Sequence, residues 1–207
     1  MLGANQLDWQ KIFAIATGVA KGLAYLHEEC LEWVLHCDVK PDNILLDVDY
    51  NPKVADFGMS KLFRQDATDN SIFLRIRGTR GYMAPEWLFN HPITSKADVY
   101  SYGIVVLEMI TGQSPMCDQA SDVSEEVEQK PLVSWVRNKV YGNGHRLTET
   151  QIIDILDPTM MDEYENGQIE KLLKVALQYV EENKDLRPSM SEVVKMLCNQ
   201  EMDDYRN

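Results

Sequence analysis

The stretch that decides the fold is His36-Cys37-Asp38-Val39-Lys40-Pro41-Asp42-Asn43, which places a histidine, two carboxylates, a lysine and an amide within eight positions. Asp56-Phe57-Gly58 begins 13 positions after Asn43, and Ala84-Pro85-Glu86 begins 28 positions after Asp56. Any one of these stretches alone would indicate little, since an Asp or Asn in a turn is common. Three of them in this order and at this spacing form a specific pattern.

The sequence around these stretches predicts mainly helices. Asp8 can cap a helix whose apolar residues recur at i, i+3 and i+4. Ser95 can cap a strongly apolar, buried helix over 95–111, which Gly112 ends. Prolines separate further predicted helices, which are Leu132–Val140, Ile152–Leu156, Ile169–Val180 and Met190–Leu197.

Short apolar segments between these helices predict strands. Residues 43–47 and 52–56 are typical of two strands joined by a turn at Asp49-Tyr50-Asn51. The predicted fold class is therefore mainly α, with one or two short β-hairpins near residue 50.

Composition limits the class of protein. The chain of 207 residues has 20 Lys and Arg against 33 Asp and Glu, a net charge of −13. Nucleic acids and anionic membrane surfaces attract cationic proteins, so neither is expected as the main partner. A hydrophobic content of 44% is enough for a core and excludes general disorder. No apolar run approaches the roughly 20 residues of a membrane-spanning helix.

The cysteines and histidines do not predict a metal centre. Cys30, Cys37, Cys117 and Cys198 lie far apart, which is typical of a reducing compartment and of small buried side chains. His27-Glu28-Glu29-Cys30 begins like a zinc-protease helix, but the second histidine that such a site needs is missing.

A local basic segment, Lys61–Arg80, contains five bases and two acids in this acidic chain. It could attract acidic substrates or a triphosphate, or it could be ordinary solvated charge on a loop. The sequence favours the second interpretation without excluding the first.

The three ordered stretches resemble the catalytic loop, the magnesium-binding motif and the end of the activation segment of protein kinases. Residues 22–30 and 78–87 are similar to plant receptor-like serine/threonine kinases, with the lectin-type S-domain group most similar. The resemblance covers residues 7–198. It implies that 1–207 form a partial kinase domain, a C-terminal lobe with catalytic loop 36–43, activation segment 56–86, central helix 95–111 and C-terminal helices 131–198.

This resemblance also implies roles in phosphoryl transfer, a reaction that depends on positioning and charge neutralisation. Asp38 would orient or accept the proton of a substrate hydroxyl. Asn43 and Asp56 would bind Mg²⁺, which prefers oxygen ligands. Lys40 would neutralise the transferring phosphate of ATP, as in serine/threonine kinases.

Further roles follow from the same resemblance. The activation segment would shape the substrate groove through Gly78, Thr79 and Tyr82. Structural positions would be His36, Asp98, Glu86 and Arg187, of which Asp98 would hold the catalytic-loop backbone and Arg187 would pair with Glu86.

Cys37 departs from the pattern, since many kinases carry an arginine there that pairs with a phosphorylated activation loop. One hypothesis is that this kinase type does not use such a switch, and Thr68 and Ser71 are the loop hydroxyls that would test it. The alternative is that Cys37 is simply a small buried residue beside the site.

The larger departure is an absent lobe. The sequence has no Gly-x-Gly-x-x-Gly before a strand and no Val-Ala-Ile-Lys strand, so the β-rich lobe that holds the ATP phosphates is missing. We therefore expect serine/threonine kinase chemistry of the family but little catalysis by this chain alone. The alternative is a non-catalytic, pseudokinase-like interaction module or a truncated fragment.

Expected partners are a protein substrate with Ser or Thr hydroxyls, ATP, and a partner kinase or a second copy bound through the surface that normally meets the other lobe. That surface should be apolar. The resemblance implies the cytoplasmic side of the plasma membrane for a receptor-like parent, and the cytoplasm for this chain alone.

Overall fold

A buried helix, α3 (Lys96–Thr111), organises the fold in the computed structural model, which describes residues 8–64, 78–89, 91–115, 131–142, 148–158 and 166–198. The helix is apolar on most sides and buries 12 of its residues. It ends at Gly112, whose φ of 65° is unfavourable for other residues and whose N–H donates to Glu108 O. Ser95 makes no capping bond through its side chain; Thr94 Oγ1 instead accepts from Lys96 N at 3.4 Å.

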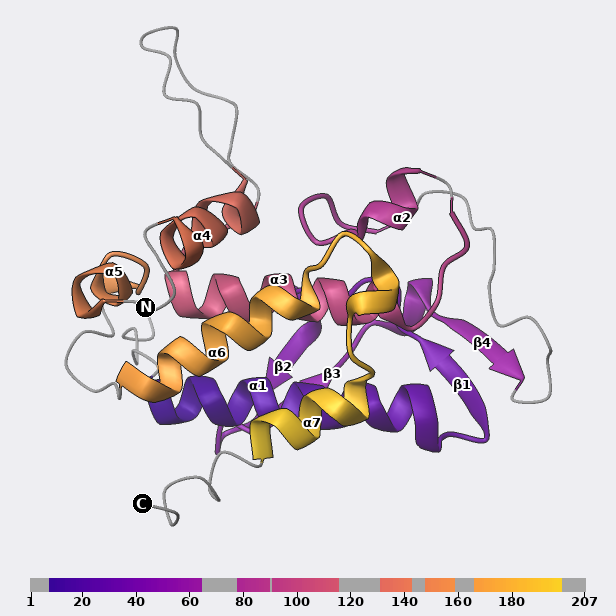
Figure 1. The fold of residues 1–207 in the computed structure, drawn as a ribbon. Coiled ribbons are helices and arrows are strands. Elements are labelled where there is room, and N and C mark those ends of the chain that lie inside the picture. Colours follow the sequence, from indigo (N-terminus) through magenta and orange to yellow (C-terminus); the bar gives the residue numbers. More distant parts are fainter. Residues whose placement is uncertain are drawn as a thin grey trace, which may run out of the picture.

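The other helices surround α3 (Figure 1). The first is capped as expected, because Asp8 Oδ1 accepts from Lys11 N at 2.8 Å. α1 (Trp9–Ala24) packs on α7 (Met190–Cys198), and α3 packs on α6 (Asn166–Tyr179). Tyr102 of α3 also donates its hydroxyl to Ala16 O at 3.0 Å. The helices are α1 (Trp9–Ala24), α2 (Pro85–Leu88), α4 (Leu132–Tyr141), α5 (Glu149–Ile153), α6 (Asn166–Tyr179) and α7 (Met190–Cys198).

The bounds of two helices were predicted wrongly. The helix expected at Ile169–Val180 begins at Asn166 and ends at Tyr179. The helix expected at Ile152–Leu156 instead begins at Glu149 and ends at Ile153. Thr148 and Gln151 form a reciprocal capping box that fixes its start. The side chains of Ile155 and Leu156 are still buried. The apolar pattern therefore predicted which side chains are buried, but not where the helix begins and ends.

Two antiparallel strand pairs lie near the first helix, one against α1 itself and the other against the turn Tyr25–Glu29 that follows it. β2 (Ile44–Leu46) pairs with β3 (Pro52–Val54), as expected. β1 (Glu32–Leu35) pairs with β4 (Lys61–Arg64), joining segments on either side of the catalytic-loop motif. The start of the basic segment is thus a strand, and residues 65–77 lie outside the described part.

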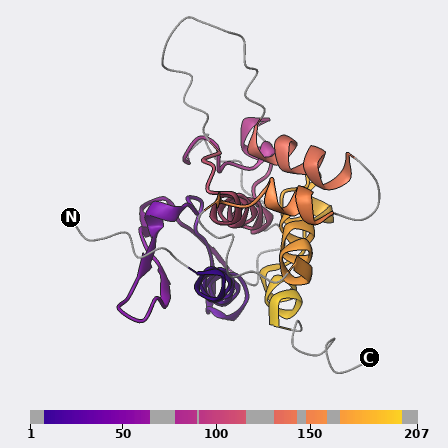
Figure 2. The ribbon, with the colours of Figure 1, turned by 90° about the vertical axis from the view of Figure 1, so that its left-hand side faces the viewer.

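The arrangement has two sides. Figure 2 looks along α1 and α3 and shows the strands on one side of them, with α6 and α7 on the other. The main core lies among α1, α3, α4, α6 and α7. A second, smaller cluster packs under the segment that leads into α2, and its buried members are Leu35, Cys37, Ala84, Trp87, Ile93 and Ala97. Within the described residues, no helix is long and apolar enough to cross a membrane.

A pair of glycine substitutions tests the close packing of α3 on α6. A Cβ on Gly103 would lie 2.8 Å from both Tyr179 Cβ and Val180 Cγ1, whereas a Cβ on Gly22 of α1 would meet only Val54 Cγ2, at 3.4 Å. We expect Gly103→Ala to lower the free energy of unfolding by about 1–3 kcal/mol. Gly22→Ala should be neutral or stabilise by about 0.5–1 kcal/mol. Urea denaturation followed by circular dichroism measures both, and equal effects would contradict this packing.

A candidate active site around Asp38

The carboxylate of Asp38 is the centre of a small polar cluster. Thr79 donates to Asp38 Oδ1 twice, from its backbone N at 3.0 Å and its Oγ1 at 2.7 Å. Lys40 Nζ lies 3.1 Å from Asp38 Oδ2, and Asn43 Nδ2 donates to the same oxygen at 3.1 Å. The sequence-predicted residues Asp38, Lys40, Asn43 and Thr79 therefore lie together.

These contacts set the charge of Asp38. Burial alone would raise its pKa, but hydrogen bonds from Thr79, Lys40 and Asn43 outweigh burial and hold the pKa below its ordinary value. Asp38 is thus ionised at neutral pH, with an oxygen lone pair available to orient or accept a proton.

Lys40 joins the catalytic loop to the activation segment. Its Nζ donates to Thr79 Oγ1 at 2.8 Å while it pairs with Asp38. The lysine is partly exposed, at 20% of its side chain, so its charge faces the open side of the cluster.

Asp98 of α3 holds the backbone of the catalytic loop. Asp98 Oδ2 accepts from His36 N at 2.7 Å, and Asp98 Oδ1 accepts from Cys37 N at 2.9 Å. Cys37 has a φ of 64°, a left-handed conformation that costs a non-glycine residue roughly 1–2 kcal/mol. The two bonds to Asp98 hold the chain in this turn just before Asp38.

His36 ties the catalytic loop to the Asp56 loop. Its Nδ1 accepts from Asp38 N at 3.3 Å, so Nε2 carries the proton and donates to Ala55 O at 2.9 Å. The ring also meets the edge of Phe57, with centroids 5.2 Å apart.

Asn43 and Asp56 carry oxygen atoms that could bind a metal ion, and both lie near the contact between His36 and the Asp56 loop. Both bonds of Asn43 Nδ2 go to Asp38, which leaves the amide oxygen Oδ1 for another ligand. Asp56 is exposed at a φ of 62°, and its Oδ1 accepts from Gly58 N at 3.2 Å. Ala55 N donates to Asn43 O at 2.9 Å and so connects the two loops.

This donor set suits a hard cation. In the described ranges, no three His, Cys, Asp or Glu side chains gather into a metal cage. Mg²⁺ does not require one, because it usually takes one or two carboxylates together with substrate phosphates and water. One exposed carboxylate and one amide oxygen therefore fit such an ion.

The activation-segment residues pack against α3. Tyr82 donates its hydroxyl to Glu108 Oε2 at 2.6 Å, and its carbonyl accepts from Ser101 Oγ at 2.7 Å. Gly78 has a φ of 134°, and a Cβ there would lie 2.9 Å from Met83 Cγ. Sequence reasoning did not identify Glu108 or Ser101, since nothing in the helix pattern distinguishes a residue that meets a distant tyrosine.

Glu86 and Arg187 form a buried bidentate ion pair. Arg187 Nη1 and Nη2 donate to Glu86 Oε1 and Oε2 at 2.7 and 2.9 Å. The guanidinium also donates to the carbonyls of Glu181, Glu182 and Lys96 and lies over the Tyr100 ring. The pair fixes α2, and hence the end of the activation segment, to the loop before α7.

Comparison with known proteins agrees with this geometry. A family described as the protein kinase domain matches residues 4–197. The chain belongs to the protein kinase domain family. The kinase domain is 44% identical over 192 residues to the G-type lectin S-receptor-like serine/threonine-protein kinase SD2-5 of Arabidopsis thaliana, covering 92% of this chain and 22% of that protein.

A second relative supports the same group. The G-type lectin S-receptor-like serine/threonine-protein kinase SD2-2 of Arabidopsis thaliana is 42% identical over 196 residues, covering 92% of this chain and 23% of that protein. The kinase domain described here thus spans about a fifth of the length of these relatives. The predicted family and the mainly helical fold class are both confirmed.

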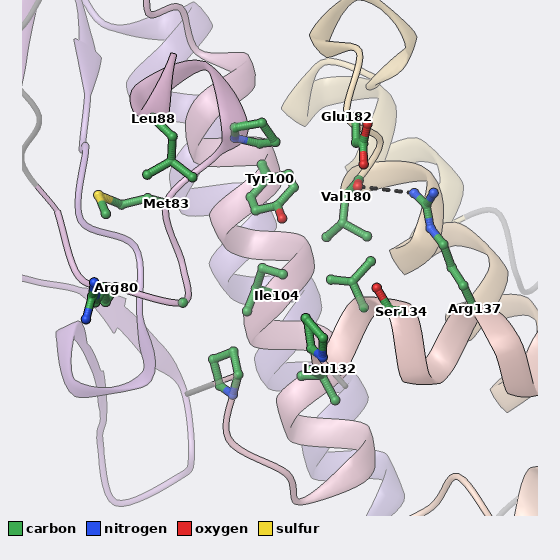
Figure 3. A pocket seen from close by; sticks show the side chains of 15 residues that line it. Arg80, Met83, Leu88, Tyr100, Ile104, Leu132, Ser134, Arg137, Val180 and Glu182 are labelled. Carbon is green, nitrogen blue, oxygen red and sulfur yellow. Dashed lines mark hydrogen bonds between the residues drawn. The ribbon is translucent and has the colours of Figure 1, made fainter. Parts of the chain in front are cut away.

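A pocket of about 480 Å³ opens beside the activation segment of this kinase domain. Figure 3 shows Arg80 and Met83 on one side of it and Leu132 and Ser134 of α4 on the other. Ile104 of α3 also lines it. The residues that line the pocket include Arg80, which directly follows Thr79, but no member of the cluster around Asp38.

Cys37 is buried in the small cluster under the activation segment of the kinase domain, and its Sγ donates to Leu35 O at 3.7 Å. Burial, and next the charge of Asp98, raise the pKa of its thiol to about 12. A neutral buried thiol is compatible with both interpretations of this position. Thr68 and Ser71, which would distinguish them, lie outside the described residues.

The Asp38 contacts predict a pH dependence of stability. A carboxylate whose pKa is lowered on folding stabilises the folded state above its unfolded pKa, about 3.9, and this contribution is lost as pH falls through the lowered pKa. Asp38→Asn should therefore reduce the free energy of unfolding by about 1.5–3 kcal/mol at pH 6 and by clearly less at pH 3. Urea titrations at both pH values measure this, with the exposed Asp154→Asn as control. A difference independent of pH would contradict the assignment.

The Cys37 thiol predicts selective alkylation. With its pKa near 12, Cys37 should react with iodoacetamide at pH 8 at least about 100-fold more slowly than the exposed Cys198, since the thiolate is the nucleophile. Mass spectrometry of peptides gives both rates, and in urea the two cysteines should react alike. Comparable rates in the folded protein would show that Cys37 is neither buried nor neutral.

Proposed function

We propose that this chain carries the catalytic and substrate-binding half of a serine/threonine protein kinase, which transfers the γ-phosphoryl group of ATP to Ser or Thr hydroxyls of proteins. The observation that carries the proposal is the Asp38 carboxylate, held on one oxygen by Thr79 and on the other by Lys40 and Asn43. Relatives named serine/threonine-protein kinases support the same chemistry.

Each side chain of the cluster has one task in this proposal. Asp38 orients the incoming hydroxyl and accepts its proton. Lys40, already paired with Asp38 and bonded to Thr79, places a positive charge where negative charge develops on the transferred group. Thr79 holds the activation segment against the catalytic loop, so that the substrate hydroxyl stays close to the Asp38 carboxylate.

Asn43 and Asp56 would hold Mg²⁺ through Asn43 Oδ1 and the Asp56 carboxylate. The bound ion would supply charge neutralisation of the ATP phosphates. The His36 bond to Ala55 O keeps the two loops that carry these ligands at a fixed distance from each other. In this proposal His36 contacts neither ATP nor substrate, and its role in the site is to connect the two loops.

The pocket beyond Arg80 supports a polypeptide substrate. A chain whose hydroxyl reaches Asp38 would continue past Thr79 toward Met83 and Leu132, which offer apolar surface. Such concave, partly apolar sites with a few polar groups at the rim are typical of ligand sites.

A second lobe is needed to complete the nucleotide site. The 207 residues include neither a Gly-rich phosphate loop nor the Val-Ala-Ile-Lys lysine. In addition, seven large apolar side chains within residues 25–62 are exposed, which supports contact of this part of the chain with another lobe or another chain: Tyr25, Leu31, Leu45, Leu46, Val48, Phe57 and Leu62. We therefore propose that the chain alone does not turn over ATP.

A non-catalytic interaction module is the second candidate, favoured by this exposed apolar surface. The intact Asp38 cluster argues against a long loss of catalytic function. Because the relatives are named receptor-like kinases, we also propose a location on the cytoplasmic side of the plasma membrane for the whole protein.

A fusion protein distinguishes these candidates. The N-terminal lobe of the SD2-5 kinase is joined ahead of Asp8 and compared with the 207-residue chain for transfer of radioactive phosphate from ATP to myelin basic protein. We expect phosphoserine and phosphothreonine only with the fusion. Asp38→Asn in the fusion should lower the rate about 10²- to 10⁴-fold.

Asp154→Asn is the matched control, because this exposed carboxylate pairs with Lys139 and belongs to neither the Asp38 cluster nor the pocket lining, so the rate should not change. A folded fusion without activity would favour the interaction module. Full activity of the Asp38→Asn fusion would reject the proposed role of that carboxylate.

A further inference from the structure

The segment that leads into α3 and the segment that leads into α7 are joined by side chains that bond each other's backbone. Lys96 Nζ donates to Arg187 O, and Arg187 Nη1 donates to Lys96 O at 2.9 Å. Lys184 Nζ also donates to Pro92 O at 3.2 Å. Lys96 and Arg187 therefore form a reciprocal contact between two parts of the chain about 90 positions apart.

Lys96 lies where a lysine is disfavoured. It is the first residue of α3, and the helix dipole opposes a cation at the N-terminus of a helix. Burial lowers the pKa of its ammonium group, and the charge of Arg187 lowers it further. The carboxylates of Glu192, Asp185 and Glu28 oppose both effects. A lysine on a protein surface extends its charge into water, whereas the charge of Lys96 is directed at one carbonyl.

Arg187 is contacted by Lys96 on both its backbone and its side chain. Its backbone is extended, with a φ of −76° and a ψ of 137°, and it follows the short turn Lys184–Leu186. The bond from Lys96 Nζ fixes the carbonyl of this residue, and the bond to Lys96 O fixes its guanidinium group. The same Nη1 also donates to Glu86 Oε1 at 2.7 Å. The contact with Lys96 therefore reaches the buried ion pair directly.

We propose that Lys96 is a positioning residue for the ion pair between Glu86 and Arg187. By holding the Arg187 backbone, its ammonium group keeps both guanidinium nitrogens opposite the two oxygens of Glu86. The ion pair fixes α2, whose Pro85 and Leu88 line the pocket beside the activation segment. Only the last step, from the position of α2 to the binding of a protein substrate, rests on the proposed function.

Amide hydrogen exchange of the 207-residue chain tests the structural part without any turnover. Lys96→Met removes the ammonium group but keeps an unbranched side chain, and Lys96→Arg keeps a cationic donor. Lys195→Met, at an exposed lysine of α7, is the matched control. The reporter is the amide of His91, which donates to Glu86 O at 2.9 Å and so depends on how firmly Glu86 is held.

We expect exchange at His91 N, corrected for global stability, to accelerate about tenfold or more in Lys96→Met. Lys96→Arg should restore most of the protection, and Lys195→Met should not differ from the unmodified chain. Unchanged exchange in Lys96→Met, or equal acceleration in the Met and Arg variants, would overturn the proposal.

If Lys96→Met does not fold, the unmodified chain still decides. In its nitrogen NMR spectrum at pH 6, the ammonium protons of Lys96 should exchange slowly enough to be observed, because they are hydrogen-bonded, whereas those of the exposed Lys195 should not. Equal exchange rates at the two lysines would reject the bond from Lys96 to Arg187 O.

Kinetics of the fusion protein test the functional part. Lys96→Met should raise the KM for myelin basic protein about fivefold and leave the KM for ATP unchanged, and Lys96→Arg should restore the first value. A general loss of folded protein would lower kcat and leave both KM values as they are. An unchanged KM for myelin basic protein would reject the step from α2 to substrate binding. If the fusion is inactive, the proposed function fails while the exchange result for Lys96 stands on its own.

Discussion

A single buried carboxylate, Asp98, constrains the whole site. It lies at the start of the central helix with its side chain 2% exposed, and no Lys or Arg in the described ranges pairs with it. A buried anion without a cation must be satisfied by hydrogen bonds, and here the donors are His36 N, Cys37 N and His27 Nε2. Asp98 lies outside the catalytic loop, and the loop is held in position because its backbone N–H groups supply hydrogen bonds that this carboxylate needs.

The remaining buried charges are distributed so that each has its own partner. Arg187 neutralises Glu86 at the end of the activation segment, and Lys40 neutralises Asp38, which accepts from Thr79 of the same segment. Between these two pairs the segment is fixed by Tyr82, which bonds Glu108. The described part of the activation segment is thus held at three residues, Thr79, Tyr82 and Glu86, each by a different region of the chain. These contacts fix the side of the pocket that the segment forms.

Local patterns predicted much of this structure. The apolar periodicity gave α3 and α7, and the β2–β3 hairpin followed from two short apolar runs around a turn. The kinase motifs gave the members of the Asp38 cluster. What could not be predicted depends on pairs far apart in sequence, such as β1 with β4 or Tyr82 with Glu108, because propensity and periodicity contain no information about partners. The bounds of α5 were predicted wrongly for a different reason, because a capping box and not the apolar pattern determines where this helix begins.

The pairing of Glu86 with Arg187 has a consequence for synthesis of the protein. The two residues are 101 positions apart, and loops of this size close late in folding. While the chain is being made, Glu86 remains hydrated and α2 has no anchor until Arg187 has left the ribosome. The end of the activation segment therefore gains this anchor only after about nine-tenths of the chain has been made.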